Sequence, residues 1–472
     1  MLELTNGGIV FSSVRLISGI NPEVIRSYDI RGVVGAQLTT RDAHALGLAY
    51  AAAAAERGRR RIAVCRDGRL SSEDLERALI EGLVEGGACV LPLGLGPTPQ
   101  MYFCVHAAGL DGGVMVTGSH NPPDQNGFKL FFEGGPVFGV ALRRLLNTPP
   151  VSRAGGGVHS LQIHGNSGAD SYVRRLGEIG RDAAGLHVVW DCGNGAVGAI
   201  IGALTASLPG RHTVLNARVD GRFPAHHPDP AVPENLRQLQ AAVLEHQADL
   251  GIAFDGDGDR IGVVDSTGAI VWPDQLLLFL ALERLRAQPG AAIVADVKSS
   301  RVLFDQVRRL GGRAIMAPSG YVLVRAAMLR ERAPLAGEMS GHIVYADCWH
   351  STDDAVFVAV RVLLAIGSLG LSPTEFRAGL PRMWATPELR LPCPESRKAG
   401  TLLEVAARLA AAGAQVDTTD GLRVTTDGGW WLLRASGTEA KLTARCEAPD
   451  AEGLERLQRE LLWHLRQSGI AC

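Results

Sequence analysis

Cysteine is scarce and scattered in this chain of 472 residues. The eight cysteines stand at positions 65, 89, 104, 192, 348, 393, 446 and 472, and no pair has the Cys-x-x-Cys spacing. This distribution argues against a cysteine metal cluster and against a disulfide scaffold. It suits a reducing environment, so we expect a cytoplasmic protein.

A basic excess and a membrane-length apolar run are missing as well. The net charge is −2, which argues against a general binder of nucleic acids or of acidic membranes. Any bound anion must then be held by local basic residues. The apolar run Leu276–Leu282 is followed at once by Glu283, so it predicts a core helix. Polar residues between Glu3 and Arg15 interrupt the apolar ones, which argues against a signal peptide.

The length of the chain predicts two to four domains, because one core of this size would be unusual. Strands alternate with helices up to about residue 382, which predicts mostly parallel sheets covered on both faces. Three segments repeat one pattern: each begins with a strand ending in an aspartate (Asp67, Asp191 or Asp296) and closes with a strand that feeds a polar loop. A smaller α+β domain follows. We therefore divide the chain into residues 1–160, 161–269, 270–382 and 383–472.

One polar loop carries a hydroxyl, an imidazole and an ammonium. The apolar run Gly113–Val116 reads as a buried strand, and Ser119, His120 and Lys129 follow it in a stretch rich in turn formers. Open α/β sheets place ligands at the carboxyl ends of their strands. The position therefore favours a ligand site, although Ser, Asn and Pro are also ordinary turn residues.

A second polar loop carries three carboxylates. Asp255, Asp257 and Asp259 alternate with glycines directly after the apolar strand Leu250–Phe254. Carboxylates at this spacing repel one another unless a cation lies between them. A hydroxyl loop together with a loop for a hard cation such as Mg²⁺ indicates phosphoryl chemistry.

Three other interpretations of these motifs are weaker. An EF-hand would need Gly and Glu where Arg260 and Ser266 stand. A serine hydrolase elbow would need glycines where Thr117 and Asn121 stand. The glycines of Gly193–Gly198 match a dinucleotide fingerprint, but they equally suit tight packing of a strand on a helix, which we favour.

Taken together, four stretches resemble the signature loops of the α-D-phosphohexomutases, in the bacterial phosphomannomutase/phosphoglucomutase branch. The resemblance runs from about Ile25 to the end of the chain. It implies three similar α/β domains with mixed sheets and a smaller C-terminal α+β domain around a central cleft, each giving one loop. The four stretches are Thr117–Pro122, Asp255–Arg260, Gly337–His342 and Arg434–Glu439, with support from Ile25–Gly32, Phe223–Pro230 and Pro233–Leu236.

The resemblance implies an enzyme that interconverts hexose 6-phosphate and hexose 1-phosphate. Such an enzyme is an intramolecular phosphotransferase that uses an active-site phosphoserine, Mg²⁺ and a hexose 1,6-bisphosphate intermediate, which must turn over in the cleft. Its substrate is a small phosphosugar, and we expect no nucleic acid, no membrane and no obligate protein partner.

The resemblance also assigns residues to roles. Ser119 is the expected phosphoserine, and Asp255, Asp257 and Asp259 are expected to hold Mg²⁺ together with its phosphate. The transfer site is expected to contain Arg31, His120, Lys129, Arg260 and Lys298, and a lysine flanked by cations is expected to have a lowered pKa and to act as acid or base. The expected substrate-binding residues are Tyr28, Tyr321, Glu338, Ser340, His342, Arg434, Ser436, Gly437 and Thr438.

One departure from the family pattern concerns the sugar. The related enzymes usually carry Thr-Gly-His where this chain has Ser319-Gly-Tyr321, so a tyrosine replaces a sugar-contacting histidine. The alternatives of mannose, glucose, both hexoses or an amino sugar therefore stay open. A catalytically silent sugar-phosphate binder is a further alternative, but it would be expected to have lost Ser119 or one of the three aspartates.

Overall fold

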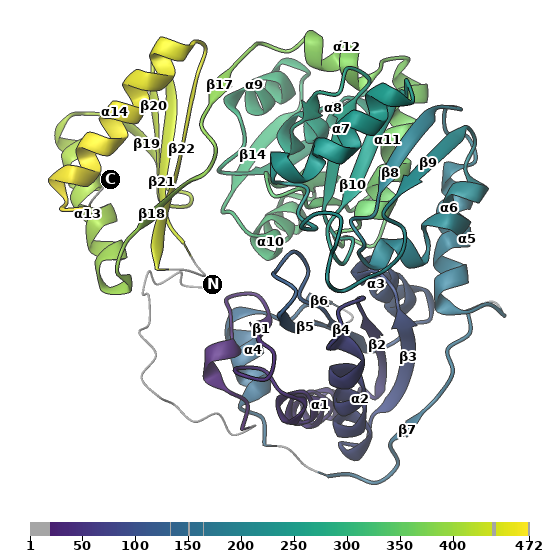
Figure 1. Cartoon of the computed structure of the whole chain (residues 1–472). Helices are drawn as coiled ribbons and strands as arrows, with labels where there is room; N and C mark the ends of the chain where they lie inside the picture. Colours follow the sequence, from purple (N-terminus) through teal and green to yellow (C-terminus); the bar gives the residue numbers. More distant parts are fainter. Residues whose placement is uncertain (1–18, 133, 150–151, 164, 437–439, 471–472) are drawn as a thin grey trace.

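The computed structural model describes residues 19–132, 134–149, 152–163, 165–436 and 440–470. Four sheets form four units, three of them with mixed strands and flanking helices and the last fully antiparallel. Figure 1 shows the first unit below, the second and third side by side above it, and the fourth at the left. This arrangement confirms the predicted fold class. None of the described helices is long and apolar enough to cross a membrane.

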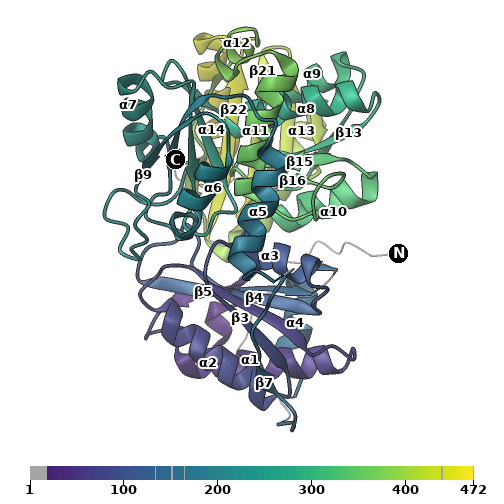
Figure 2. The ribbon, with the colours of Figure 1, turned by 90° about the vertical axis from the view of Figure 1, so that its right-hand side faces the viewer.

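The first unit has a sheet in the order β1-β5-β4-β2-β3-β7, with β6 beside β5. Helices α1 and α2 lie on one face and α3 on the other (Figure 2). The helices and strands are η1 Pro22–Val24, β1 Ile30–Val33, α1 Thr40–Ala55, β2 Arg61–Arg66, α2 Ser72–Glu85, β3 Cys89–Leu95, α3 Thr98–Ala107, β4 Gly112–Val116, β5 Gln125–Phe132, β6 Gly135–Pro136, α4 Gly139–Leu146 and β7 Gly157–Val158.

The second and third units have sheets in the orders β12-β11-β10-β8-β9 and β14-β13-β15-β16. The second contains α5 Gly168–Gly180, β8 His187–Asp191, η2 Ala196–Ala199, α6 Ile201–Ser207, β9 Arg211–Leu215, η3 Pro233–Leu236, α7 Arg237–Glu245, β10 Leu250–Phe254, β11 Ile261–Asp265 and β12 Ile270–Val271. The third contains α8 Pro273–Ala287, β13 Ala292–Asp296, α9 Arg301–Arg309, β14 Arg313–Ala317, α10 Tyr321–Glu331, β15 Leu335–Gly337, β16 Ile343–Tyr345, α11 Ala355–Leu369 and α12 Pro373–Ala378.

The fourth unit has a sheet in the order β17-β22-β21-β20-β19, with β18 also paired to β22. Its strands are β17 Trp384–Ala385, β18 Leu389–Pro392, β19 Gln415–Asp417, β20 Leu422–Thr426, β21 Gly429–Ala435 and β22 Lys441–Ala448, and its helices are α13 Glu395–Ala411 and α14 Ala451–Gln467. Both helices pack on the sheet, and buried residues such as Trp431 and Leu461 fill the space between them.

The second and third units share one core. Trp190 of β8, Phe279 of α8 and Phe357 of α11 belong to a single buried cluster, and α11 contacts α5, α8, β10 and β11. The first and fourth units have hydrophobic clusters of their own. Phe103 and Cys104 of α3 also belong to the shared cluster, so the first unit is joined to the central pair through α3 and the fourth unit has the most separate core.

Each signature loop joins two antiparallel strands. The pairs are β4–β5, β10–β11, β15–β16 and β21–β22. A connection this short can only return antiparallel, so the first three sheets are mixed, as the predicted fold class has it, while their other strands are mainly parallel. The sequence pattern placed residues 125–129, the start of β5, in the loop itself, so this returning strand was missed.

The glycines of Gly193–Gly198 serve packing, as the favoured interpretation predicts. A Cβ on Gly195 would meet the carbonyl oxygen of Gly256 at 2.8 Å, and a Cβ on Gly198 would meet that of Ala217 at 2.1 Å. Only glycine allows backbone segments to approach this closely. Gly195 brings the turn after β8 against the loop of the three aspartates, and Gly198 lies against the segment after β9.

Candidate active site

A cavity of about 1580 Å³ lies where the four units meet. Its lining includes Ser119 from the first unit, Arg260 from the second, Glu338 from the third and Arg434 from the fourth. Most of the predicted site residues line it, namely Tyr28, Arg31, Ser119, His120, Lys129, Asp259, Arg260, Lys298, Tyr321, Glu338, Ser340, His342, Arg434 and Ser436. The structure thus brings side chains more than 400 positions apart in the sequence into one cleft.

Buried side chains that follow β2 fix the conformation of the Ser119 loop by hydrogen bonds. Ser119 has a φ of 49°, in a region that residues other than glycine rarely occupy. The buried guanidinium of Arg69 donates to the carbonyl oxygens of Ser119 at 2.7 Å and Asn121 at 2.6 Å. Asp67, at the end of β2, accepts from the Thr117 hydroxyl at 2.7 Å. These contacts hold the loop in its uncommon conformation.

The Ser119 hydroxyl points at the carboxylate loop. Its Oγ donates to Asp255 Oδ2 at 2.8 Å, and His120 Nδ1 lies 3.2 Å from the same Oγ. Burial, followed by the charges of Arg260, Arg31 and Lys129, lowers the pKa of His120 well below its usual value. The His120 imidazole is therefore neutral at pH 7, and a neutral imidazole beside a hydroxyl can take up or return a proton.

The three carboxylates form a buried cluster that could hold a metal ion. Asp255 Oδ1 accepts from the backbone N–H groups of Gly258, Asp259 and Arg260 at 3.0 to 3.2 Å. One oxygen of each aspartate lies within 4.8 Å of the others. Oδ1 of both Asp257 and Asp259 is buried and accepts no hydrogen bond from the described residues. Such a set of buried, unpartnered oxygens fits a hard divalent cation.

Lys129 supplies the positive charge in this structure. Its Nζ lies 2.6 Å from Asp257 Oδ2 and also donates to Asp259 Oδ2. Burial alone raises the pKa of Asp257, but the Lys129 ammonium, the Thr98 hydroxyl and Arg31 together outweigh burial and lower it. Burial and the neighbouring Asp257 and Asp259 charges raise the pKa of Asp255 instead. The pKa of Lys129 is itself raised, because its carboxylate partners outweigh burial. The predicted lowering of a lysine pKa is therefore wrong for Lys129.

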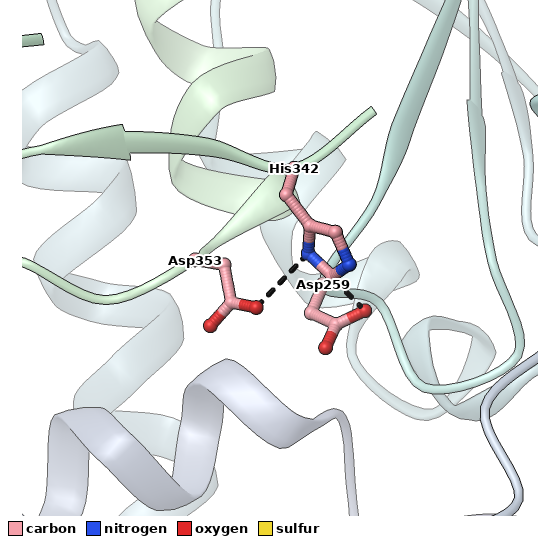
Figure 3. Close-up of side chains that lie close together, drawn as sticks. All are labelled: Asp259, His342 and Asp353. Atoms are coloured by element: carbon pink, nitrogen blue, oxygen red, sulfur yellow. Dashed lines mark ion pairs between the residues drawn. The ribbon is translucent and has the colours of Figure 1, made fainter. Parts of the chain in front are cut away.

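Arg31 and Arg260 both line the cavity that Ser119 lines. Arg31, on β1, donates to the Gly118 carbonyl oxygen at 2.7 Å and to Asn121 Oδ1 at 2.9 Å. Arg260 Nε donates to His342 Nε2 at 3.0 Å. His342 Nδ1 in turn lies 2.9 Å from Asp353 Oδ2 and 3.9 Å from Asp259 Oδ1 (Figure 3). Two arginines therefore frame the space beside Ser119.

The predicted sugar loop is connected to its neighbours by hydrogen bonds. Glu338 Oε1 accepts from the Gly320 N–H at 2.6 Å, and Ser340 donates to Glu338 Oε2 at 3.3 Å. Tyr28 reaches from the first unit to the Ser319 carbonyl oxygen at 3.5 Å. Burial and the Glu338 carboxylate raise the pKa of Tyr28 to about 12, so it stays a hydrogen-bond donor.

The fourth unit brings basic residues to the far side of the cleft. Arg434 Nε donates to Asp420 Oδ2 at 2.9 Å, and the same oxygen accepts from the Ser319 N–H at 3.0 Å. Lys398 donates to the Ser436 carbonyl oxygen at 2.7 Å. Lys298, from the third unit, lies 3.4 Å from Glu388. The predicted phosphate-binding residues Gly437 and Thr438 lie outside the described residues.

Several residues that support the site lie outside the four signature stretches. Asp67, Arg69 and Asp353 are buried at 1%, 2% and 1% exposure, and each holds a signature loop or a residue of one. The sequence shows the repeat of Asp67, Asp191 and Asp296 at or directly after the ends of β2, β8 and β13, but it does not predict which groups these aspartates bind. Buried charged residues are uncommon unless paired, so the repeat of strand-ending aspartates was the available signal.

Comparison with known proteins extends over nearly the whole chain. Models of the phosphoglucomutase/phosphomannomutase alpha/beta/alpha domains I, II and III match residues 22–145, 170–268 and 272–383, and the model of the C-terminal domain matches 388–462. A phosphoglucomutase from Neisseria gonorrhoeae is 40% identical, with 94% of this chain and 96% of the relative covered. A phosphomannomutase/phosphoglucomutase from Pseudomonas putida is 40% identical, with 92% and 94% covered. The crystal structure of a phosphoglucomutase/phosphomannomutase family protein from Burkholderia thailandensis is 37% identical, with a TM-score of 0.86 and 95% and 98% covered.

Proposed function

This chain belongs to the phosphoglucomutase/phosphomannomutase family. From that membership we propose a role for each site residue in the reaction. It is a hexose phosphate mutase, an enzyme of the isomerase kind. The observation that carries the proposal is the Ser119 hydroxyl, which bonds Asp255 inside the cavity and has His120 beside it. Ser119 is the residue that carries the phosphoryl group between turnovers.

Each half of the reaction exchanges one phosphorus–oxygen bond for another. A sugar hydroxyl attacks the phosphorus on Ser119, the new P–O bond forms as the bond to Oγ breaks, and Oγ keeps the electron pair. The hydroxyl proton passes to a base, and Oγ takes up a proton as its bond to phosphorus breaks, whereas in the return transfer Oγ loses that proton as it attacks the bisphosphate. His120 suits the proton transfer at Oγ, because its imidazole is neutral and 3.2 Å away. A hexose 1,6-bisphosphate then turns around and returns its other phosphoryl group to Ser119.

The three aspartates Asp255, Asp257 and Asp259 would hold Mg²⁺, and the buried, unpartnered Oδ1 atoms of Asp257 and Asp259 fit that ion. When bound, the ion neutralises charge on the transferring phosphoryl group. Arg31 and Arg260 orient the same group with fork-shaped donors. In mutational studies, losing one such contact costs about 2.7–4 kcal/mol of barrier.

Glu338 and Ser340 would bind sugar hydroxyls, with Tyr28 beside them, while Arg434 and Ser436 bind the phosphate that is not being transferred. Relatives of equal identity are named for glucose alone and for mannose with glucose, so both hexoses are proposed substrates. The free state of the seven described cysteines supports a reducing compartment, and we place the enzyme in the cytoplasm.

A coupled assay on several hexose 1-phosphates, with a trace of hexose 1,6-bisphosphate, tests the proposal. We expect turnover of glucose and mannose 1-phosphates that depends on the bisphosphate and on Mg²⁺. Ser119→Ala should lose nearly all of it, while Ser266→Ala, an exposed serine bonded to Thr374, should keep full activity. Wild-type activity on neither hexose would overturn the assignment of substrate.

A further inference from the structure

One carboxylate lies between the proposed phosphate side and the proposed sugar side of the cleft. Asp420 stands in the loop between β19 and β20 of the fourth unit, the unit at the left of Figure 1. Its Oδ2 accepts from Arg434 Nε at 2.9 Å and from the backbone N–H of Ser319 at 3.0 Å. Arg434 and Ser319 line the cavity, whereas Asp420 does not. Asp420 can therefore act on a substrate only through the residues that it holds.

The backbone after Asp420 brings the carboxylate close to Arg434. Gly421 has a φ of 80°, in the left-handed region that favours glycine. A Cβ on Gly421 would lie 2.8 Å from the Cα of Arg434, so a larger residue would push this loop away from β21. Strand pairing continues from there, with Leu422 of β20 opposite Leu433 of β21. The glycine thus fixes where Asp420 stands relative to the guanidinium.

Ser319, the other partner of Asp420, has polar contacts with three of the four units. Its N–H donates to Asp420 of the fourth unit. Its Oγ donates to Asp296 Oδ2 of the third unit at 2.7 Å, and its carbonyl oxygen accepts from the Tyr28 hydroxyl of the first unit at 3.5 Å. Ser319 is 6% exposed, and hydrogen bonds shielded from water are stronger than exposed ones. The carboxylate is therefore bound to a residue at which three units meet.

The amide next to that of Ser319 holds the proposed sugar-binding carboxylate. The N–H of Gly320 donates to Glu338 Oε1 at 2.6 Å. Two neighbouring backbone amides thus bond two carboxylates, one on the phosphate side and one on the sugar side of the cleft. A continuous set of hydrogen bonds connects Arg434, Asp420, this loop and Glu338.

We propose that Asp420 is a positioning residue that presents the Arg434 guanidinium to the non-transferred phosphate at a fixed distance from Glu338. An arginine side chain has several rotatable bonds, and holding it in one geometry before the substrate arrives removes an ordering cost from binding. Because Asp420 binds at Nε, the two Nη groups can donate to phosphate oxygens. This inference rests on the proposed function, since it takes Arg434 and Glu338 as substrate-binding residues.

Two substitutions separate positioning from charge. Asp420→Ala removes the accepting oxygen, whereas Asp420→Asn keeps an accepting oxygen and removes only the charge. With saturating hexose 1,6-bisphosphate, Asp420→Ala should raise KM for glucose 1-phosphate about tenfold, the lower end of the effect of a hydrogen bond to a charged group. The value of kcat should stay within about threefold, because the phosphate contact is made equally in the ground state and the transition state.

The asparagine variant should stay within about threefold of the wild-type KM, because it can keep both hydrogen bonds. If the carboxylate acted only as a negative charge near the phosphate, both variants would lower KM. That result would overturn the inference, and so would a loss of kcat with KM unchanged.

A double variant shows whether Asp420 acts through Arg434. In an Arg434→Ala background, Asp420→Ala should raise KM by no more than about threefold further, because residues that act as a unit are not additive. A further rise of about tenfold, as for independent sites, would contradict the inference.

The matched control is Asp417→Ala in the same part of the fourth unit. Asp417 is an exposed residue of β19 whose Oδ1 accepts from the Thr419 N–H at 2.8 Å, and its variant should keep wild-type KM and kcat. An equal rise of KM in Asp417→Ala would assign the effect to the loop as a whole and overturn the role of Asp420.

The second test needs no turnover. Calorimetry measures the binding of glucose 6-phosphate to a Ser119→Ala parent, which cannot carry the phosphoryl group. We expect the Kd to rise about tenfold when Asp420→Ala is added to this parent. An equal Kd in the two proteins would refute the inference while the proposed mutase function stands. No binding to the parent would remove the proposed function, and the inference with it.

Discussion

Replacing Lys129 with methionine tests whether its ammonium is the cation of the metal-free site. The Lys129 side chain is 14% exposed, while Asp257 and Asp259 are 0% and 1% exposed. Removing one member of a buried ion pair costs about 3–5 kcal/mol, because the remaining charge stays buried without a partner. Since Lys129 retains some contact with water, we take about 3 kcal/mol. At roughly 2–4 °C per kcal/mol for a domain of this size, the first melting transition should fall by about 6–12 °C without metal.

Mg²⁺ should largely repair this loss. At a hundred times its Kd, a ligand that binds only the native state adds about 2.7 kcal/mol. In the wild type, Mg²⁺ must first displace the Lys129 ammonium from the two carboxylates, and this displacement reduces the net gain in stability. Lys129→Met should therefore bind Mg²⁺ more tightly by calorimetry and gain more in Tm from the metal than the wild type does.

The control for this experiment is Lys298→Met. Its ammonium lies 3.4 Å from the partly exposed Glu388 and 4.0 Å from Asp296, so its loss should leave the Mg²⁺ affinity unchanged. The chain has only four lysines, so lysine ¹⁵N labelling gives few side-chain signals, and the signal lost in Lys129→Met should be the one that moves when Mg²⁺ is added. Equal Tm and equal Mg²⁺ affinity in wild type and Lys129→Met would refute the reasoning.

Three other predictions follow from the site and its supports. Intact-mass and peptide analysis of fresh protein should find one phosphate on Ser119, and phosphate on a different residue would reject its assigned role. Glu338→Ala should reduce turnover of both hexoses alike, and their catalytic efficiencies should lie within about two decades, ~3 kcal/mol; a preference above about four decades would contradict this. Burial, then the charges of His106 and Arg175, lowers the pKa of His350 to about 4, so the unfolded chain binds the proton first and stability should fall as pH drops from about 6.5 to 4. His350→Phe should flatten that part of a Tm-against-pH curve, and an unaltered slope would remove His350 as its cause.

The sequence predicted the chemical groups of the cleft better than it predicted the strands and buried side chains that support them. Ser119 and Asp255 could be found because each follows an apolar strand in a loop of turn formers, and the structure places them in hydrogen-bond contact. The direction of the returning strands was missed, since Gln125–Phe132 reads as a continuation of the loop until its pairing with β4 is seen. Arg69 and Asp353 were missed for a different reason. Their roles come from burial and from partners far away in the chain, and no local pattern reports either.

The hairpin form of the four loops limits how the cleft can open. Each of the first three loops is the tip of two adjacent strands that belong to the sheet of its unit, so such a tip cannot swing like a hinged lid without breaking strand pairing. The bisphosphate proposed above would need room to reverse direction, and that room would come from displacing a whole sheet. The second and third units share a core, so we expect them to stay fixed relative to each other. Phe103 and Cys104 of the first unit belong to the same core, so the fourth unit is the part left to move, and the turnover rate of this enzyme should then respond to solvent viscosity as the motion of a large body does.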